Sequence, residues 1–207
     1  MPFRIAVLIS GEGTNLQALL DTVHGREGVE VACVASSRPG ARGLERAAHA
    51  GVETGVFEIS AYRDRTARDL ALADWLDERG IDLVVLAGFM ELLGREFIAR
   101  FRGRIVNVHP ALLPAFPGVR AIEQALEHGV KVMGVTIHFV DEGVDSGPII
   151  LQEAFALSYP CNIAAIEERV HRIEHRLLPE AVRLIAEGRL HMDPDNPRLV
   201  RIDGRGD

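Results

Sequence analysis

The sequence predicts an α/β protein: a single-domain, doubly wound and mostly parallel β-sheet of about seven strands with helices on both faces. Apolar segments of strand length alternate with helical patterns along nearly the whole chain. Only 5% of the residues are aromatic, and alanine, valine, leucine and isoleucine abound, as in parallel strands buried under helices. With 207 residues, 47% of them hydrophobic, the chain suffices for one well-buried core.

The elements follow from periodicity and from their stop signals. Strands are expected at residues 4–10, 30–36, 53–57, 83–87, 105–109, 133–140 and, as the last, 149–156. Helices are expected at residues 14–24, 43–50, 63–79, 94–101, 121–128 and 163–187. In the helix at 63–79, Leu70, Ala73 and Leu76 form the expected apolar face. We expect one domain over residues 1–190 and a partly ordered tail over 191–207, because prolines and glycines interrupt the tail.

Composition excludes several classes of protein. The net charge is -7 and no run of lysine and arginine occurs, which argues against a nucleic-acid partner. No apolar stretch approaches the roughly 20 residues of a membrane-spanning helix, so we expect a cytoplasmic protein without a membrane partner. Cys33 and Cys161 lie far apart, and no cysteine and histidine cluster has zinc spacing. We therefore expect neither a metal nor a structural disulfide.

A glycine-rich loop at residues 10–15 joins the first strand to the first helix, where backbone N–H groups favour an anion. A phosphate site is expected here, although a tight turn capped by Thr14 or Asn15 has the same pattern. A dinucleotide fits less well, because Leu16 stands where a third glycine is needed. Arg38 suits a 2′-phosphate, so an NADP-dependent oxidoreductase remains open as a distant alternative.

Three polar residues follow apolar strands: Asn107, His109 and Asp145. Singly, each has a structural explanation as a turn cap, a hydrogen-bonded strand histidine or a loop residue. Together, at the carboxyl side of neighbouring strands, they indicate a site. A carboxylate near His109 favours its protonated form, and an amide with an imidazolium suits a transition-state oxyanion. The pattern predicts direct acyl or formyl transfer to an amine, without metal. For His138 two interpretations stay open, support of this site or a buried strand histidine.

Several motifs in one order carry a family resemblance. Residues 9–18, 86–90 and 107–114 (Asn-Val-His-Pro-Ala-Leu-Leu-Pro) are followed by matches at residues 116–118, 138–148 and 174–175. Over about residues 4–190 the chain resembles the phosphoribosylglycinamide formyltransferases, folate-dependent enzymes of purine biosynthesis. The resemblance implies transfer of a formyl group from 10-formyltetrahydrofolate, the co-substrate, to the amine of glycinamide ribonucleotide. It also places nucleotide binding in the N-terminal part and folate binding with catalysis in the C-terminal part.

By position, the resemblance implies that Asn107, His109 and Asp145 are catalytic. Asn107 and protonated His109 would stabilise the tetrahedral oxyanion, and Asp145 would keep His109 charged. The implied ribonucleotide ligands are Gly13, Thr14 and Asn15 at the phosphate and Glu174 at the ribose. The implied folate ligands are Arg65 (or, in another register, Arg63), Met90, Glu91, Leu92, Leu93, Asn107, Asp141, Glu142, Gly143, Val144 and Asp145. The partners would be these small molecules, for a monomer or homodimer.

The chain departs from the family pattern at a few positions. Glu91 stands where many relatives have arginine, and Ala111 where serine is common. Glu12 adds negative charge beside the expected phosphate, so its side chain should point outward. The resemblance also suggests a cis peptide bond between Leu113 and Pro114.

Other functions fit the sequence less well than this one. Methionyl-tRNA formyltransferase adds a tRNA-facing domain, and formyltetrahydrofolate hydrolase usually adds an N-terminal regulatory domain; we expect neither in this chain. A non-catalytic folate or nucleotide binding module belongs to a different class, and the intact trio argues against it. Turnover discriminates between these classes.

Overall fold

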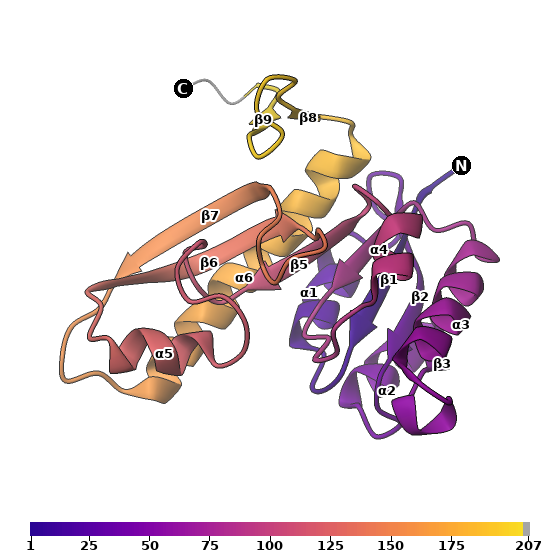
Figure 1. Cartoon of the computed structure of the whole chain (residues 1–207), viewed down its shortest axis with the longest axis horizontal. Helices are drawn as coiled ribbons and strands as arrows, with labels where there is room; N and C mark the ends of the chain where they lie inside the picture. Colours follow the sequence, from indigo (N-terminus) through magenta and orange to yellow (C-terminus); the bar gives the residue numbers. More distant parts are fainter. Residues whose placement is uncertain (205–207) are drawn as a thin grey trace. The chain divides into compact units, whose positions relative to one another are not determined.

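The computed structural model describes residues 1–204. The chain divides into two compact units, Met1–Val106 and Asn107–Asp207, whose helices and strands Figure 1 labels. Hydrogen-bonded neighbours form a seven-stranded sheet in the order β3-β2-β1-β4-β5-β6-β7. β1 pairs in parallel with β2 and β4, β2 pairs in parallel with β3, and β7 runs antiparallel to β6. The predicted mostly parallel sheet of about seven strands is confirmed.

The first unit alternates strands and helices. Its elements are β1 (Phe3–Ile9), α1 (Thr14–Thr22), β2 (Val29–Ser36), α2 (Arg42–His49), β3 (Glu53–Val56), the 3-10 helix η1 (Ile59–Ala61), α3 (Arg65–Asp77), β4 (Leu83–Leu86) and α4 (Arg95–Arg100). Helix α1 contacts α2, and α3 contacts α4. Since β1 lies between β2 and β4, the strand order reverses there, and the loops after β1 and β4 leave the sheet at this switch point.

Helix α3 corrects the predicted apolar face. Its buried residues include Leu72, Ala73 and Leu76, whereas Leu70 is 40% exposed. At about 100° per residue, Leu70 lies about 240° around the helix from Leu76, while Leu72 is one turn away. The helix begins where Asp64 caps it, since the carboxylate accepts a hydrogen bond from the Ala67 N–H at 2.8 Å.

The second unit holds one long helix against an antiparallel pair of strands. Its elements are β5 (Ile105–His109, which starts at the end of the first unit), α5 (Ala121–Glu127), β6 (Val132–Phe139), β7 (Ile149–Ala156), α6 (Ile163–Ala186), β8 (Leu190–Met192) and β9 (Val200–Ile202). Helix α6 packs on β6 and β7 and continues through Pro179 (Figure 1). The Leu113–Pro114 peptide bond is cis, as the resemblance suggested.

Two strands follow residue 156 within the described residues, so the prediction that 149–156 is the last strand was wrong. β8 pairs antiparallel with β9 in a small hairpin. Each strand has three residues, too few for an alternating pattern to stand out in the sequence. The predicted tail at 191–207 therefore includes an ordered hairpin, and residues 205–207 of it lie outside the described residues. None of the described helices combines the length and the apolar character needed to cross a membrane.

The close approach of β6 to its neighbours gives a stability prediction. A Cβ added at the buried Gly134 would lie 2.2 Å from the backbone oxygen of Glu153 and 2.5 Å from Leu112 Cδ2. Overpacking of this kind costs about 1–3 kcal/mol. We expect Gly134→Ala to lower the melting temperature by about 4–8 °C, the shift that about 2 kcal/mol produces in a chain of this size.

Gly40→Ala is the matched control, because no heavy atom lies within 4 Å of the added Cβ. Its melting temperature should equal that of the wild type within error. Equal melting temperatures for both variants would show that β6 has room at Gly134, contrary to the packing described.

Candidate active site

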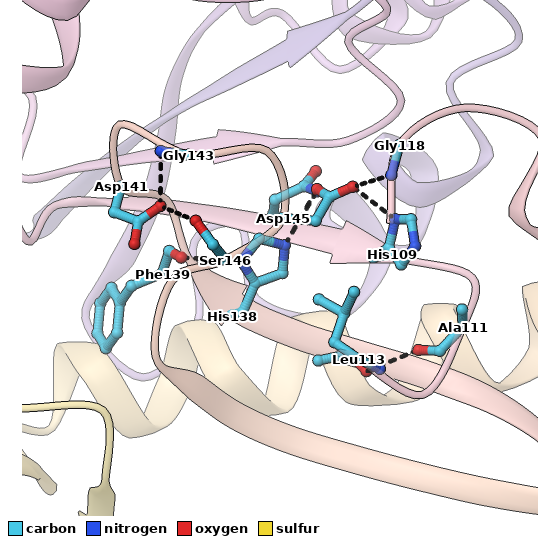
Figure 2. Close-up of polar contacts among 12 residues, drawn as sticks. His109, Ala111, Leu113, Gly118, His138, Phe139, Asp141, Gly143, Asp145 and Ser146 are labelled. Carbon is cyan, nitrogen blue, oxygen red and sulfur yellow. Dashed lines mark hydrogen bonds and ion pairs between the residues drawn. The ribbon is translucent and has the colours of Figure 1, made fainter. Parts of the chain in front are cut away.

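The second unit brings together the three polar residues predicted to form a site. β5 carries Asn107 and His109 on one face, and the loop at residues 141–147 returns Asp145 to them. His109 Nδ1 lies 3.3 Å from Asp145 Oδ2, and Asn107 Nδ2 lies 3.3 Å from Asp145 Oδ1. Figure 2 shows Asp145 directed at the His109 ring. One carboxylate thus contacts both the imidazole and the amide.

Both ring nitrogens of His109 face oxygen acceptors. Nδ1 faces the Asp145 carboxylate, and Nε2 lies 2.8 Å from the backbone oxygen of Phe116. The side chain is only 5% exposed, so these contacts are largely shielded from water. A neutral imidazole has one N–H and can donate to only one of the two oxygens. The doubly protonated ring is the form that satisfies both.

Asp145 is held as a carboxylate by the groups around it. Burial favours its neutral form, but the His138 ring nitrogen 3.6 Å away, the Gly118 N–H at 2.7 Å and the charge of His109 outweigh that effect. Together they hold the pKa of Asp145 below its usual value. The backbone of Asp145 has a φ of 49°, a left-handed conformation that costs a non-glycine residue free energy.

His138 is a buried strand histidine that also contacts the site. Its Nδ1 lies 2.8 Å from the Phe139 carbonyl oxygen, and its Nε2 lies 3.2 Å from Asn107 Nδ2 and 3.6 Å from Asp145 Oδ1. The sequence left two interpretations open for His138, support of the site and a buried strand histidine, and both apply. Because His138 and Asp145 both lie on the Nδ2 side of Asn107, they determine which side of the amide carries the nitrogen.

The loop that carries Asp145 is compact. Asp141 Oδ1 accepts hydrogen bonds from the Gly143 N–H at 3.0 Å and from Ser146 Oγ at 2.6 Å, as Figure 2 shows. A Cβ at Gly143 would lie 2.0 Å from Ser146 Oγ, and one at Gly147 would lie 1.8 Å from the Phe139 oxygen. Gly147 therefore requires glycine, whereas a side chain at Gly143 would displace the Ser146 hydroxyl. In the same loop Val144 is 55% exposed and presents an apolar surface.

The glycine loop of the first unit ends in a glycine cap. Gly13 is the N-cap of α1, with φ 70°, and an added Cβ would lie 2.6 Å from Gly43 Cα. The alternative that Thr14 or Asn15 caps this helix was wrong, because α1 already begins at Thr14. A glycine cap offers no side-chain acceptor to the amides of the first helical turn, which suits an external anion.

Arginine side chains near this glycine loop offset the negative charge of Glu12. Arg42 Nη1 pairs with Glu12 Oε2 at 3.0 Å, and Arg46 Nε donates to the Glu12 backbone oxygen at 2.8 Å. The Glu12 side chain is 63% exposed, which confirms that it points outward. A hollow beside the loop is lined by Ser10, Gly11, Glu12, Arg38, Pro39, Gly40, Ala41, Arg42 and Glu58.

The loop after β4 is tied to the loop after β1. The Met90 N–H donates to Ser10 Oγ at 2.8 Å, and Ser10 Oγ lies 2.7 Å from Ser37 Oγ. The other end of the loop after β4 is held by Asp69, whose Oδ2 accepts a hydrogen bond from the Gly94 N–H at 2.6 Å. Between these anchors the apolar side chains of Met90 and Leu92 are 67% and 62% exposed, so they are available to a ligand.

The remaining residues that were predicted as ligands differ in their exposure and in their contacts. Glu174 is buried in α6, and its Oε2 lies 3.0 Å from His171 Nδ1, a contact that raises the pKa of His171. Arg65 is the exposed first residue of α3, whereas Arg63 pairs with Asp64 at 2.9 Å. Glu91 and Leu93 are half-buried, and Glu142 is exposed.

Several groups of the site were not found from the sequence. The Phe116 carbonyl and the Gly118 N–H are backbone groups, so the motif match at residues 116–118 does not tell which of their atoms face the site. Ser10, whose hydroxyl joins two loops, has only its place at the end of β1 as a signal. Within residues 1–204, no group of three or more histidine, cysteine, aspartate or glutamate side chains is arranged to hold a metal ion.

Comparisons with known proteins agree on one family. A family model described as formyl transferase matches residues 3–182. Phosphoribosylglycinamide formyltransferase of Haemophilus influenzae is 39% identical over 203 residues, 98% of this chain and 94% of that protein. The crystal structure of glycinamide ribonucleotide transformylase 1 from Symbiobacterium toebii has a TM-score of 0.92 at 52% identity, covering 97% of this chain and 94% of that one.

Other relatives are much longer than this chain. The human trifunctional purine biosynthetic protein adenosine-3 is 44% identical over 190 residues, which are 91% of this chain and 19% of the human protein. The chain spans between 14% and 20% of the length of the trifunctional relatives from human, cattle and fruit fly.

The contacts of Asp145 predict how stability depends on pH. Because its pKa is lowered in the folded state, its ionic contacts stabilise the fold above the ordinary aspartate pKa of about 3.9. This stabilisation is lost as the pH falls below that value and through the lower folded pKa. Between about pH 5 and pH 2, the free energy of unfolding should therefore fall more steeply in the wild type than in Asp145→Asn.

Urea unfolding at a series of pH values measures this difference. Asp21→Asn is the control, because Asp21 is an exposed carboxylate on α1, and it should keep the wild-type slope. Parallel curves for wild type and Asp145→Asn would mean that the pairing of Asp145 contributes nothing to the folded state.

Proposed function

The chain belongs to the formyl transferase family, and on that premise we propose that it transfers a formyl group from 10-formyltetrahydrofolate to the amine of glycinamide ribonucleotide in purine biosynthesis. The observation that carries the proposal is the contact of Asp145 with His109. This contact favours a positively charged imidazole, which can donate a hydrogen bond beside the Asn107 amide. The full-length relative from Haemophilus influenzae, named for this reaction, supports the choice of substrates. We propose a cytoplasmic enzyme that acts on these small molecules as a monomer or homodimer.

In the proposed reaction the substrate amine attacks the formyl carbon directly. His109, protonated and paired with Asp145, donates a hydrogen bond to the oxygen that gains negative charge. To do so, His109 Nε2 exchanges the Phe116 carbonyl for that oxygen. His109 then gives its proton to the departing folate nitrogen and takes up the proton that the attacking amine loses, so that the ring ends protonated again while Asp145 remains ionised.

Asn107 is proposed as the second donor to the same oxygen. Its Nδ2 contacts with His138 and Asp145, at 3.2 and 3.3 Å, are long for N–H···O and N–H···N hydrogen bonds. Long contacts are weak, so one amide hydrogen can turn to the developing oxyanion at little cost. Loss of one such donor typically raises the barrier by about 2.7–4 kcal/mol.

The binding roles are proposed unit by unit. In the first unit, Gly13, Thr14 and Asn15 bind the phosphate of the ribonucleotide, and Arg65 with Met90, Glu91, Leu92 and Leu93 binds the folate. In the second unit, Glu174 binds the ribose, and Asn107 with Asp141, Glu142, Gly143, Val144 and Asp145 binds the folate. A flat pterin needs apolar contacts, and each unit exposes apolar side chains of this kind: Met90 and Leu92 in the first unit, and Val144 in the second.

An assay with 10-formyltetrahydrofolate and glycinamide ribonucleotide tests the proposal directly. Release of the deformylated folate, dependent on both substrates, is the expected result. A parallel melting experiment separates the alternatives: the ribonucleotide and reduced folate should raise the melting temperature, and NADP should not. Stabilisation by both ligands without turnover would indicate a binding module instead of an enzyme.

Replacement of Asp145 should separate catalysis from binding. Asp145→Asn keeps the shape of the side chain but removes the charge that favours protonated His109, so kcat should fall by about 10²- to 10⁴-fold. The dissociation constant for glycinamide ribonucleotide, measured by calorimetry, should stay within about threefold of the wild type, because Asp145 is not assigned to the nucleotide. Asp21→Asn serves as the control again. A weakened nucleotide complex at unchanged kcat would make Asp145 a binding residue.

A further inference from the structure

The C-terminal hairpin contacts the loop that carries Asp145. Arg198 Nη2 donates a hydrogen bond to the backbone oxygen of Ser146 at 2.7 Å. The next residue, Leu199, forms an isolated parallel bridge with Ile149, the first residue of β7. The hairpin thus touches the residue that follows Asp145 and the strand into which the loop leads.

The hairpin is an ordered element that presents Arg198 from a defined turn. β8 and β9 pair from Leu190 with Ile202 to Met192 with Val200. Between them the buried Asp193 accepts hydrogen bonds from the N–H groups of Asp195 and Asn196 at 2.9 and 3.0 Å and pairs with Arg201. The turn that leads to Arg198 is therefore closed by side-chain hydrogen bonds.

The loop needs such support because Asp145 is strained. Its φ of 49° is a conformation that persists in a non-glycine residue only when the surroundings fix it. Inside the loop, Ser146 Oγ donates to Asp141, and the Gly118 N–H donates to Asp145 (Figure 2). These bonds hold the two side chains. The hydrogen bond from Arg198 restrains the backbone as well, because it ends on the Ser146 carbonyl.

We infer that the C-terminal hairpin is a positioning element for Asp145 and that Arg198 is the residue through which it acts. The inference rests on the proposed function, since the position of Asp145 matters only if it controls the charge of His109. Arg198 touches no reacting atom. It holds the peptide beside Asp145, so that the carboxylate keeps its place against His109.

The expected effect is moderate, because the Arg198 side chain lies in an exposed segment. Loss of a typical hydrogen bond corresponds to about a two- to twelvefold change in an equilibrium or a rate. We expect Arg198→Ala to lower kcat by about three- to tenfold. The KM for glycinamide ribonucleotide should not change, because the hairpin is not assigned to the nucleotide.

The experiment compares three variants of the full chain. Arg198→Ala removes the bond to Ser146, and Arg198→Lys keeps a donor of similar reach and should restore part of kcat. Arg189→Ala is the matched control, because Arg189 donates to the Asp203 backbone oxygen at 2.6 Å at the base of the same hairpin. Each variant is measured by steady-state kinetics and by amide hydrogen exchange of residues 141–148.

Faster exchange at residues 141–148 with reduced kcat, in Arg198→Ala but not in Arg189→Ala, supports the inference. Unchanged exchange in Arg198→Ala overturns it, and so does faster exchange with unchanged kcat. Equal losses in Arg189→Ala also overturn it, because the hairpin would then act only through general stability. If the protein has no formyl transfer activity, the proposed function fails by itself. The exchange data still decide whether Arg198 holds the loop.

Discussion

The contact between His109 and Asp145 is the interaction on which the rest of the site depends. The two residues lie on different segments of the second unit, and several features of the fold serve to bring them together. β5 ends at His109, and the chain returns along β6 and turns tightly at residues 141–147 before β7. The turn closes because Gly147 passes close to the Phe139 carbonyl, where a larger residue would clash. The segment after β5 contributes as well, since Gly118 donates to Asp145 and Phe116 accepts from His109.

Burial increases the energetic importance of the contact between His109 and Asp145. A carboxylate that is mostly removed from water is costly unless hydrogen bonds and opposite charge compensate it. Asp145 receives that compensation from His138, Gly118 and His109, and the result is a lowered pKa despite its burial. The same contacts give His109 two oxygen acceptors, which a doubly protonated ring satisfies. The geometry therefore couples the charge on one residue to the charge on the other.

Much of the fold could be predicted from the sequence, because apolar periodicity is a local signal. The strands at 105–109 and 149–156 have the predicted bounds, and the other major elements differ by a residue or two at their ends. The failures have physical causes. Leu70 was counted with the apolar residues Ala73 and Leu76 of its helix, but Leu72 is the leucine that is buried beside them, because a few apolar residues fit more than one register. The β8 and β9 hairpin was missed because its strands are short and Asp193 closes the turn between them through bonds to backbone groups.

The site could be predicted only in part, for a related reason. Asn107 and His109 share a face because of strand periodicity, and Asp145 was predicted as their partner from its place after an apolar strand, with the motif order of the family in agreement. The groups that complete their surroundings, such as the Phe116 carbonyl and the Gly118 N–H, belong to the backbone, so the motif at residues 116–118 did not reveal their contacts. The contact of Arg198 with Ser146 is equally hidden, since a surface arginine in a proline-containing tail has no recognisable pattern.

Nitrogen and proton NMR of the His109 ring, in wild type and in Asp145→Asn, tests the central claim most directly. The chemical shifts of Nδ1 and Nε2 report whether each nitrogen carries a proton. If Asp145 pairs with the cationic ring, both nitrogens of the wild type carry a proton, and the Nδ1 proton shows the downfield shift of a hydrogen bond to a carboxylate, which Asp145→Asn loses. Identical spectra of the ring in both proteins would contradict the account, because Asp145 would then have no influence on the charge of His109.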